Sequence, residues 1–173
     1  MPKTRSAKYN DAIFIAQAEV DSQRNLYSGL VAQSFLDSLS VQDSASSWET
    51  IISDNNNTTI ILEELGKPIG ALSCGPCRDD DLNSQVTGEI WSIYVDPSYQ
   101  RKGYGTSLFE EARQALRKAG YNELSIWVLD TDLRARGFLE SLGLTCDGAA
   151  RFDDYYGDGI VTKVRYKGDF SHQ

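Results

Sequence analysis

A strand, a glycine turn and a helix follow one another in the middle of the chain, and this succession constrains the fold most. Residues 87–95 are rich in β-branched and aromatic side chains, as is typical of a strand, and Asp96-Pro97 ends it. Gly103 and Gly105 then open a run whose apolar residues recur at helical spacing. These apolar residues are Leu108, Phe109, Ala112, Ala115, Leu116 and Ala119. The spacing predicts an amphipathic helix over about 103–119 that Gly120 ends.

The glycine turn has the properties of a phosphate-binding loop. Glycine lets the backbone approach a ligand closely, and the first N–H groups of a helix have no partner within it. The helix dipole adds favourable potential for an anion, and Arg101 and Lys102 place positive charge beside the turn. The P-loop pattern is excluded because no Gly-Lys-Ser/Thr follows, and the dinucleotide fingerprint is excluded because Leu108 takes the place of its third glycine.

The rest of the chain predicts an α+β fold. Helices are expected over about 11–23 and 30–39, a hairpin over 58–62 and 69–74, a polar loop over 75–84, a strand over 124–129, a helix that Thr131 or Asp132 caps and Gly143 ends, and a last strand over 160–166. This order predicts a mixed sheet packed between helices. A length of 173 residues suits one domain, so we expect a single domain over 1–173.

The charge balance favours some partners over others. The chain carries 17 basic and 25 acidic residues, a net charge of −8, and its pI is near 4.6. This argues against nucleic acid, which normally meets a basic face, and favours cationic partners such as amines, although solubility alone accounts for the charge equally well. We find neither an apolar run of about 20 residues nor a secretory leader, so we expect no membrane segment and a cytoplasmic location.

The cysteines suggest a redox site that the neighbouring sequence does not support. Cys74-Gly75-Pro76-Cys77 matches the thioredoxin box, which should open an amphipathic helix. Residues 78–84 are polar throughout and predict a loop, so we interpret the match as coincidence and keep thiol redox chemistry as an alternative. Zinc would need two more ligands, and only Cys146 and His172 remain, so we predict no metal.

Two blocks of sequence resemble a known family. Gln100-x-x-Gly103-x-Gly105, after a strand that ends in Val-Asp-Pro, resembles the coenzyme A signature of the GNAT superfamily of N-acetyltransferases. Residues 127–144 resemble the family's Asn-x-x-Ala-x-x-Phe-Tyr-x-x-x-Gly-Phe element, and the resemblance covers roughly 58–166. It implies a GNAT-type mixed, mostly antiparallel sheet flanked by helices on both faces, with acetyl-CoA as co-substrate.

The resemblance also implies a set of cofactor-binding residues. The pyrophosphate is expected on the amides of Arg101 to Thr106, and the pantetheine arm along the backbone of Ile93 to Val95, where the strand splays from its neighbour. Simple core packing is the alternative for Ile93 and Val95. The full set is Ile93, Tyr94, Val95, Gln100, Arg101, Lys102, Gly103, Tyr104, Gly105, Thr106 and Asp132.

Two positions depart from the family pattern. Asp132 stands where the family often has Asn, and it can cap a helix but cannot donate as an amide does. Leu139 stands where the family often has Tyr, which would give a proton to the departing thiolate. If Leu139 removes an essential proton donor, the chain is a catalytically weak acyl-CoA-binding protein of the same fold. Otherwise water or a hydroxyl of Tyr94, Tyr104 or Tyr155 replaces it.

Transfer to an amine requires a base, because an alkylammonium has a pKa of about 10.4 and only the neutral amine is nucleophilic. Glu89 is our candidate base. It lies six residues before Val95, a spacing that resembles the catalytic glutamate of the histone-acetyltransferase branch. The alternative is a strand carboxylate that a neighbour or solvent satisfies. We therefore expect an N-acetyltransferase that acts by direct transfer on a primary amine of a small molecule or peptide.

Aromatic and acidic residues suggest where a cationic acceptor would bind. Trp91, Trp127, Tyr94, Tyr155 and Tyr156 are candidates for lining its site, with core packing as the alternative for the tryptophans. Asp79, Asp80 and Asp81 form one acidic loop, and Asp153, Asp154 and Asp158 another. Either loop would attract a polyamine, an aminoglycoside or a basic peptide end, unless it is simply solvated. The sequence leaves a homodimer open.

Overall fold

The structure is a computed structural model that describes residues 2–153 and 160–170. The described chain forms the strands β1 (Lys3–Ser6), β2 (Thr58–Glu64), β3 (Lys67–Pro76), β4 (Thr87–Val95), β5 (Glu123–Leu129), β6 (Thr145–Asp153) and β7 (Val161–Asp169). Its α-helices are α1 (Ala12–Leu26), α2 (Gln33–Ser38), α3 (Val41–Ser53), α4 (Tyr104–Lys118) and α5 (Leu133–Ser141), and short 3-10 turns cover η1 (Tyr9–Asp11) and η2 (Pro97–Tyr99).

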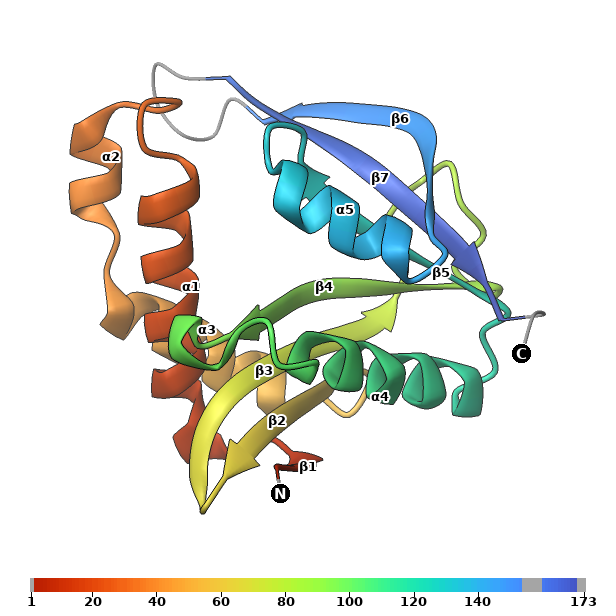
Figure 1. Cartoon of the computed structure of the whole chain (residues 1–173), viewed down its shortest axis with the longest axis horizontal. Helices are drawn as coiled ribbons and strands as arrows, with labels where there is room; N and C mark the ends of the chain where they lie inside the picture. The colour runs from red at the N-terminus through yellow and green to blue at the C-terminus, as the bar shows by residue number, and fades with distance from the viewer. Residues whose placement is uncertain (1, 154–159, 171–173) are drawn as a thin grey trace.

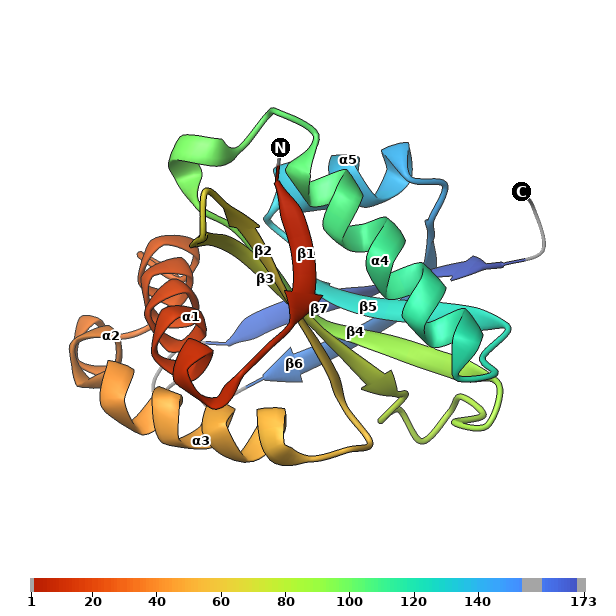
Figure 2. The ribbon, with the colours of Figure 1, turned by 90° about the horizontal axis from the view of Figure 1, so that it is seen from below.

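The strands form one mixed sheet in the order β1-β2-β3-β4-β5-β7-β6. Neighbouring strands are antiparallel except β4 and β5, which run parallel, with α4 as the crossover between them (Figure 1). Figure 2 shows helices on both faces of the sheet: α4 and α5 on one, α1 and α3 on the other. The predicted α+β fold with a mostly antiparallel sheet flanked by helices is therefore confirmed.

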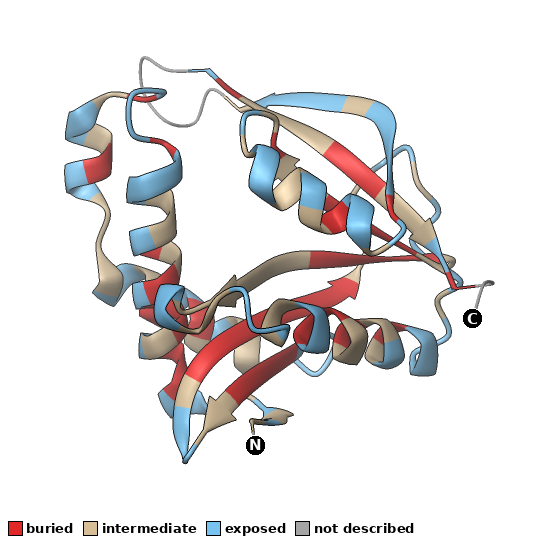
Figure 3. Ribbon diagram, viewed as in Figure 1, coloured by how far each residue is buried: buried red, intermediate tan, exposed pale blue. Residues whose placement is uncertain are grey.

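The largest core lies between the sheet and the pair α4 and α5. The predicted apolar face of α4 is buried there: Leu108, Phe109, Ala112 and Leu116 are at most 2% exposed. Gly88 permits this close packing, because a Cβ at Gly88 would lie 2.7 Å from the Leu116 side chain. A second core joins α1 and α3 to β2 and β3 through small residues and Trp48. The buried ribbon in Figure 3 follows these central strands and the inner faces of the helices.

Some elements differ from those predicted. The expected helix over 30–39 is the shorter α2, because Leu30 and Val31 belong to the turn that follows α1 and the backbone of Ala32 is extended (ψ 135°). The helix α3 was not predicted, because its sequence is serine-rich and buries only Ala45 and Trp48, although Ser40 caps it by accepting from the Asp43 N–H. The strands β1 and β6 were also missed: β1 has four residues, and β6 is exposed along most of its length and contains an irregularity between Cys146 and Ala150. None of the helices in the described ranges is long and apolar enough to span a bilayer.

Candidate active site

A gap opens inside the sheet between β4 and β5. The two strands pair only from Thr87↔Glu123 to Ile90↔Ile126. Beyond this point β4 stays paired with β3 as far as Val95, and β5 stays paired with β7 as far as Leu129. In Figure 1 the two halves of the sheet meet at the right and diverge toward the left. The splayed strand that the resemblance implied is therefore present, and it begins directly after Ile90.

The backbone of β4 presents hydrogen-bonding groups to this gap. The Asp96 N–H donates to the Ile69 carbonyl of β3 at 2.8 Å. The backbone N–H and C=O groups of successive strand residues point to opposite edges of the strand. Since those of Asp96 point to β3, those of Ile93 and Val95 point to the gap. The Val95 carbonyl confirms this direction, since it accepts from Gln100 Nε2 at 2.9 Å on the far side from β3. The N–H and C=O of Ile93 and the N–H of Val95 therefore face the gap, where an extended ligand could pair with them, while the Val95 carbonyl is bonded to Gln100.

The glycine turn lies at the mouth of the gap. Asp96 caps η2 by accepting from the Ser98 N–H, and the backbone then turns through left-handed conformations at Arg101 (φ +63°) and Gly103 (φ +83°). Gly103 is the N-cap of α4, so the N–H groups of the first turn have no acceptor within the helix. Left-handed residues next to such a turn gather N–H groups into an anion-binding concavity. The side chains of Arg101 and Lys102 are exposed beside it.

Gln100 and α5 close the other side of the gap. Gln100 donates to the Val95 carbonyl and accepts from Arg134 Nη2 at 2.6 Å, so one side chain joins the end of β4 to the start of α5. Asp132 is the N-cap of α5 and accepts from the Ala135 N–H at 2.9 Å. Asp thus fills the capping role that its place in the motif requires. The Asp132 carboxylate is committed to the helix terminus.

Two of the three tyrosines considered as proton donors, Tyr94 and Tyr104, contact other side chains of the fold. The Tyr94 ring packs edge-on against Phe14 of α1, with 6.2 Å between ring centroids. Burial, and to a smaller extent the negative charges of Asp96 and Asp21, raise the pKa of Tyr94. The Tyr104 hydroxyl donates to Glu64 at 3.3 Å, and burial beside that carboxylate raises the pKa of Tyr104. Leu139 is 1% exposed and belongs to the core beneath α5. Tyr155 lies outside the described residues.

Glu89 lies at the closed end of the gap. It is 3% exposed, and its backbone pairs with Gly75 on one side and Ser125 on the other. Its Oε2 accepts from the Arg78 backbone N–H at 2.9 Å, and its Oε1 accepts from Arg78 Nη2 at 3.3 Å. The Arg78 guanidinium also lies 4.6 Å from the centroid of the Trp91 ring. Glu89 therefore has a partner, and its role as a base stays a prediction.

The acidic loop 79–81 is not a free anionic surface. Arg165, whose side chain is 5% exposed, forms ion pairs with Asp79 (3.1 Å), Asp81 (2.7 Å) and Asp147 (2.8 Å). Asp79 also accepts from Trp127 Nε1 at 2.9 Å through Oδ2. The sequence reading missed Arg165 because nothing local marks a strand arginine as the partner of carboxylates more than 80 residues away. Two of the three predicted attracting charges are thus neutralised within the chain, and Asp80 is exposed.

The second acidic cluster and the remaining aromatic candidates are only partly described. Asp153 pairs with Lys163 at 3.0 Å and lies 3.8 Å from Arg151, whose guanidinium stands 4.6 Å from the Trp127 ring centroid. Asp154, Tyr155, Tyr156 and Asp158 lie outside the described residues. Trp91 and Trp127 each pack beneath an arginine at the sheet surface. They are therefore neither simple core residues nor aromatic faces fully open to an acceptor.

The two cysteines of the thioredoxin-like box are buried thiols. Burial raises the pKa of Cys74 to about 12. Burial also raises the pKa of Cys77, whose sulfur lies 3.6 Å from the Ser125 hydroxyl. A redox cysteine needs a stabilised thiolate, and here both environments favour the neutral form. Cys74 is moreover inside β3, with no helix at the box, so the structure argues against redox chemistry.

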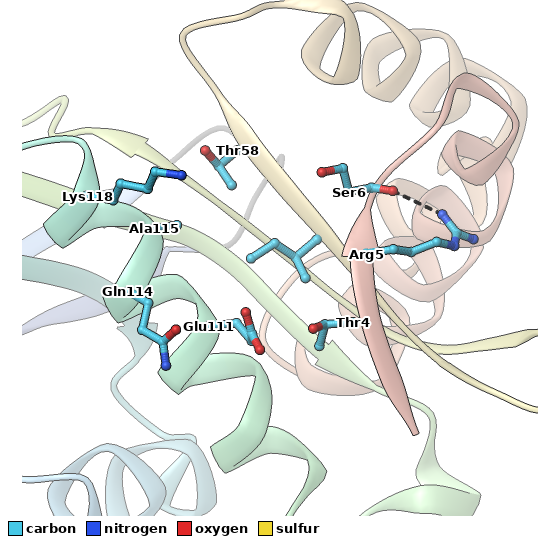
Figure 4. Close-up of a pocket in the computed structure, with 9 residues that line it drawn as sticks. Thr4, Arg5, Ser6, Thr58, Glu111, Gln114, Ala115 and Lys118 are labelled. Atoms are coloured by element: carbon cyan, nitrogen blue, oxygen red, sulfur yellow. Dashed lines mark hydrogen bonds between the residues drawn. The ribbon is translucent and has the colours of Figure 1, made fainter. Parts of the chain in front are cut away.

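A separate hollow of about 340 Å³ lies between β1, β2 and α4, at the opposite edge of the sheet from β6 (Figure 4). It is lined by Thr4, Arg5, Ser6, Thr58, Ile60, Glu111, Gln114, Ala115 and Lys118. Its side chains have mixed polarity and both signs of charge, and none of them belongs to the predicted cofactor set. The gap between β4 and β5 remains the site that the sequence and the backbone both indicate.

Comparison with known proteins agrees with this geometry. The N-acetyltransferase YuaI of Bacillus subtilis, itself uncharacterised, is 28% identical over 130 residues, which cover 75% of this chain and 73% of that protein. Mycothiol acetyltransferase of Beutenbergia cavernae is 37% identical over 60 residues, but these are only 35% of this chain and 20% of that protein. The match to mycothiol acetyltransferase thus concerns a minor part of that longer chain.

Solved structures show the same fold. An N-acetyltransferase from Staphylococcus aureus Mu50 superposes with a TM-score of 0.77 at 20% identity, over 98% of both chains. YncA of Salmonella typhimurium, solved with acetyl-CoA, gives 0.75 at 19% identity over 100% of this chain and 96% of that one. The model of the Acetyltransferase (GNAT) family matches residues 24–144, which include the gap, the glycine turn and α5. The chain therefore belongs to the GNAT family and is an acyl-CoA-dependent acetyltransferase.

Proposed function

We propose that this protein transfers the acetyl group of acetyl-CoA directly to a primary amine of a small molecule or peptide. The observation that carries the proposal is the coincidence of two features: β4 loses its neighbour after Ile90, and the unpaired amides of α4 lie where that open edge ends. One feature suits an extended, amide-bearing arm and the other a pyrophosphate. Among solved structures of the fold, the PaiA N-acetyltransferase of Thermoplasma acidophilum holds coenzyme A and YncA holds acetyl-CoA.

The cofactor would contact mainly the backbone of this chain. The amides from Arg101 to Thr106 would hold the pyrophosphate, helped by the exposed cations Arg101 and Lys102. The N–H and C=O of Ile93 and the N–H of Val95 would pair with the pantetheine arm, while Gln100 keeps the Val95 carbonyl. Gln100 and Asp132 would affect the cofactor indirectly. Gln100 links the end of β4 to the start of α5, and Asp132 caps α5.

The chemistry needs a base near the closed end of the gap, and Glu89 is the carboxylate there. We assign it the removal of one proton from the acceptor ammonium. The neutral amine then forms the N–C bond, the C–S bond breaks, and a backbone N–H at the splayed strands would stabilise the oxyanion. The nitrogen loses two protons in all, of which one ends on the coenzyme sulfur and one in solvent. Leu139 has no hydroxyl and the Tyr104 hydroxyl donates to Glu64, so we assign the sulfur's proton to water, with Tyr94 and Tyr155 as the alternatives.

The test is a panel of primary amines and basic peptides with acetyl-CoA, followed by mass spectrometry of the products. Released coenzyme A should be measured by chromatography, since Cys146 is exposed and would react with thiol reagents. Tight acetyl-CoA binding without acetylation of any amine would favour the alternative, a catalytically weak acyl-CoA-binding protein. Absence of acetyl-CoA binding would refute both.

A further inference from the structure

Arg78 occupies the place beside Glu89 that an acceptor would need. Its guanidinium contacts two groups: the Glu89 carboxylate at 3.3 Å and the face of the Trp91 ring, 4.6 Å from the centroid. A carboxylate next to an aromatic face is the combination that binds organic cations, because the charge and the ring quadrupole both attract them. Glu89 and Trp91 therefore form a cation-binding site beside the candidate base, and the Arg78 guanidinium occupies it.

Arg78 makes fewer contacts with carboxylates than Arg165, a second arginine of this surface. The Arg165 side chain is 5% exposed and pairs with three carboxylates. It donates to Asp81 through two nitrogens and to Asp147 at 2.8 Å. The Arg78 side chain is 63% exposed and makes one ion pair at 3.3 Å. The Glu89 side chain, by contrast, is only 4% exposed, so its carboxylate needs a cationic partner. Arg78 can therefore leave Glu89 readily when another cation takes its place, whereas Arg165 would have to leave three carboxylates at once.

The departure of Arg78 would free one oxygen of Glu89 without releasing the carboxylate. Oε2 accepts from the Arg78 backbone N–H, a contact that does not depend on the side chain, whereas Oε1 accepts from the guanidinium. We infer that the acceptor's ammonium replaces the Arg78 guanidinium between Glu89 and Trp91, so that Arg78 acts as a built-in competitor of the substrate. This inference rests on the proposed function, and it adds that the acceptor binds as a compact organic cation.

The variant Arg78→Gln tests the exchange. Removal of the competitor should lower the KM for the acceptor amine about three- to tenfold, the combined worth of the cation–π contact and of an ion pair whose arginine is exposed, with kcat within about twofold of wild type. Arg151→Gln is the matched control: its guanidinium also covers a tryptophan, Trp127, and its loss changes the net charge equally, but its carboxylate neighbour is Asp153. We expect Arg151→Gln to leave the KM unchanged.

Three results would overturn the inference: an unchanged KM in Arg78→Gln, an equal fall in both variants, or a lower kcat at constant KM, which would make Arg78 a positioning residue for Glu89. A second readout does not need turnover. Ethylguanidinium should shift the Trp91 indole N–H resonance in an NMR titration of Arg78→Gln, and at the same millimolar concentrations should not shift it in wild type. If no variant acetylates any amine, the proposed function fails while this titration still decides the exchange, and equal shifts in both proteins would refute it.

Discussion

Gly105→Ala should separate cofactor binding from stability. Gly105 lies in the first turn of α4, where alanine is intrinsically favoured over glycine by up to about 1 kcal/mol. A Cβ there would lie 3.4 Å from Phe138 Cζ of α5, which is ordinary contact. The backbone of Gly105 also has no left-handed angle that alanine would strain. We therefore expect the melting temperature to stay within about 4 °C of wild type.

The same Cβ stands between α4 and α5, beside the amides that we assign to the pyrophosphate. Loss of one hydrogen bond to a charged group costs about 1.5–3 kcal/mol, so the affinity for acetyl-CoA should fall about ten- to 150-fold. Calorimetry measures the affinity, and thermal unfolding without ligand measures the stability. Gly137→Ala is the matched control, because Gly137 is exposed within α5 and a Cβ there meets nothing within 4 Å. A folded Gly105→Ala variant with wild-type affinity would refute the assignment of the amides.

Three further predictions concern single side chains. Glu89→Gln should keep the affinity for acetyl-CoA but lower turnover about 10²-fold, with a smaller loss at high pH where more acceptor is neutral, and equal pH–rate profiles would show Glu89 to be structural. Arg165→Met should lower the melting temperature by about 6–12 °C, because it leaves the nearly buried Asp79 without its cation and lowers the free energy of unfolding by roughly 3 kcal/mol. A shift below about 2 °C would contradict this. Arg5, by hydrogen bonding, holds the pKa of Asp11 below its usual 3.8, so Asp11 stabilises the fold above about pH 4 and this contribution is lost as pH falls through the lowered value. Melting curves of wild type and Asp11→Asn should therefore differ at pH 7 and converge toward pH 2; a constant difference would exclude the linkage.

The parts of the fold that repeat a simple period were predictable from sequence. The apolar face of α4 and the β-branched runs of β2 and β4 are local patterns, and each is found where its pattern places it. The helix α3 was not predictable, because its stability comes from packing Trp48 against α1 rather than from a continuous apolar face. The strand β6 was not predictable either, since it is exposed along most of its length and exists through its pairing with β7.

The site divides in the same way. The glycine turn is contiguous in sequence, so its motif placed Gln100, Gly103 and Gly105 together at the gap. The environment of Glu89 depends on contacts between distant segments, and no spacing rule links it to Arg78 or links Arg165 to Asp79. Sequence reading therefore anticipated the local geometry of the glycine turn better than the surroundings of Glu89.

The gap between β4 and β5 also bears on how the protein behaves in solution. An unpaired strand edge is a template to which another chain can add, and proteins normally shield or interrupt such edges. Here the exposed stretch of β4 is short, and the parallel pairing at Ile90 and Ile126 closes one end of it. The Gln100 bridge to Arg134 occupies the Val95 carbonyl at the other end. An intruding strand would thus find few consecutive partners, and a ligand seated in the gap would complete the protection against aggregation.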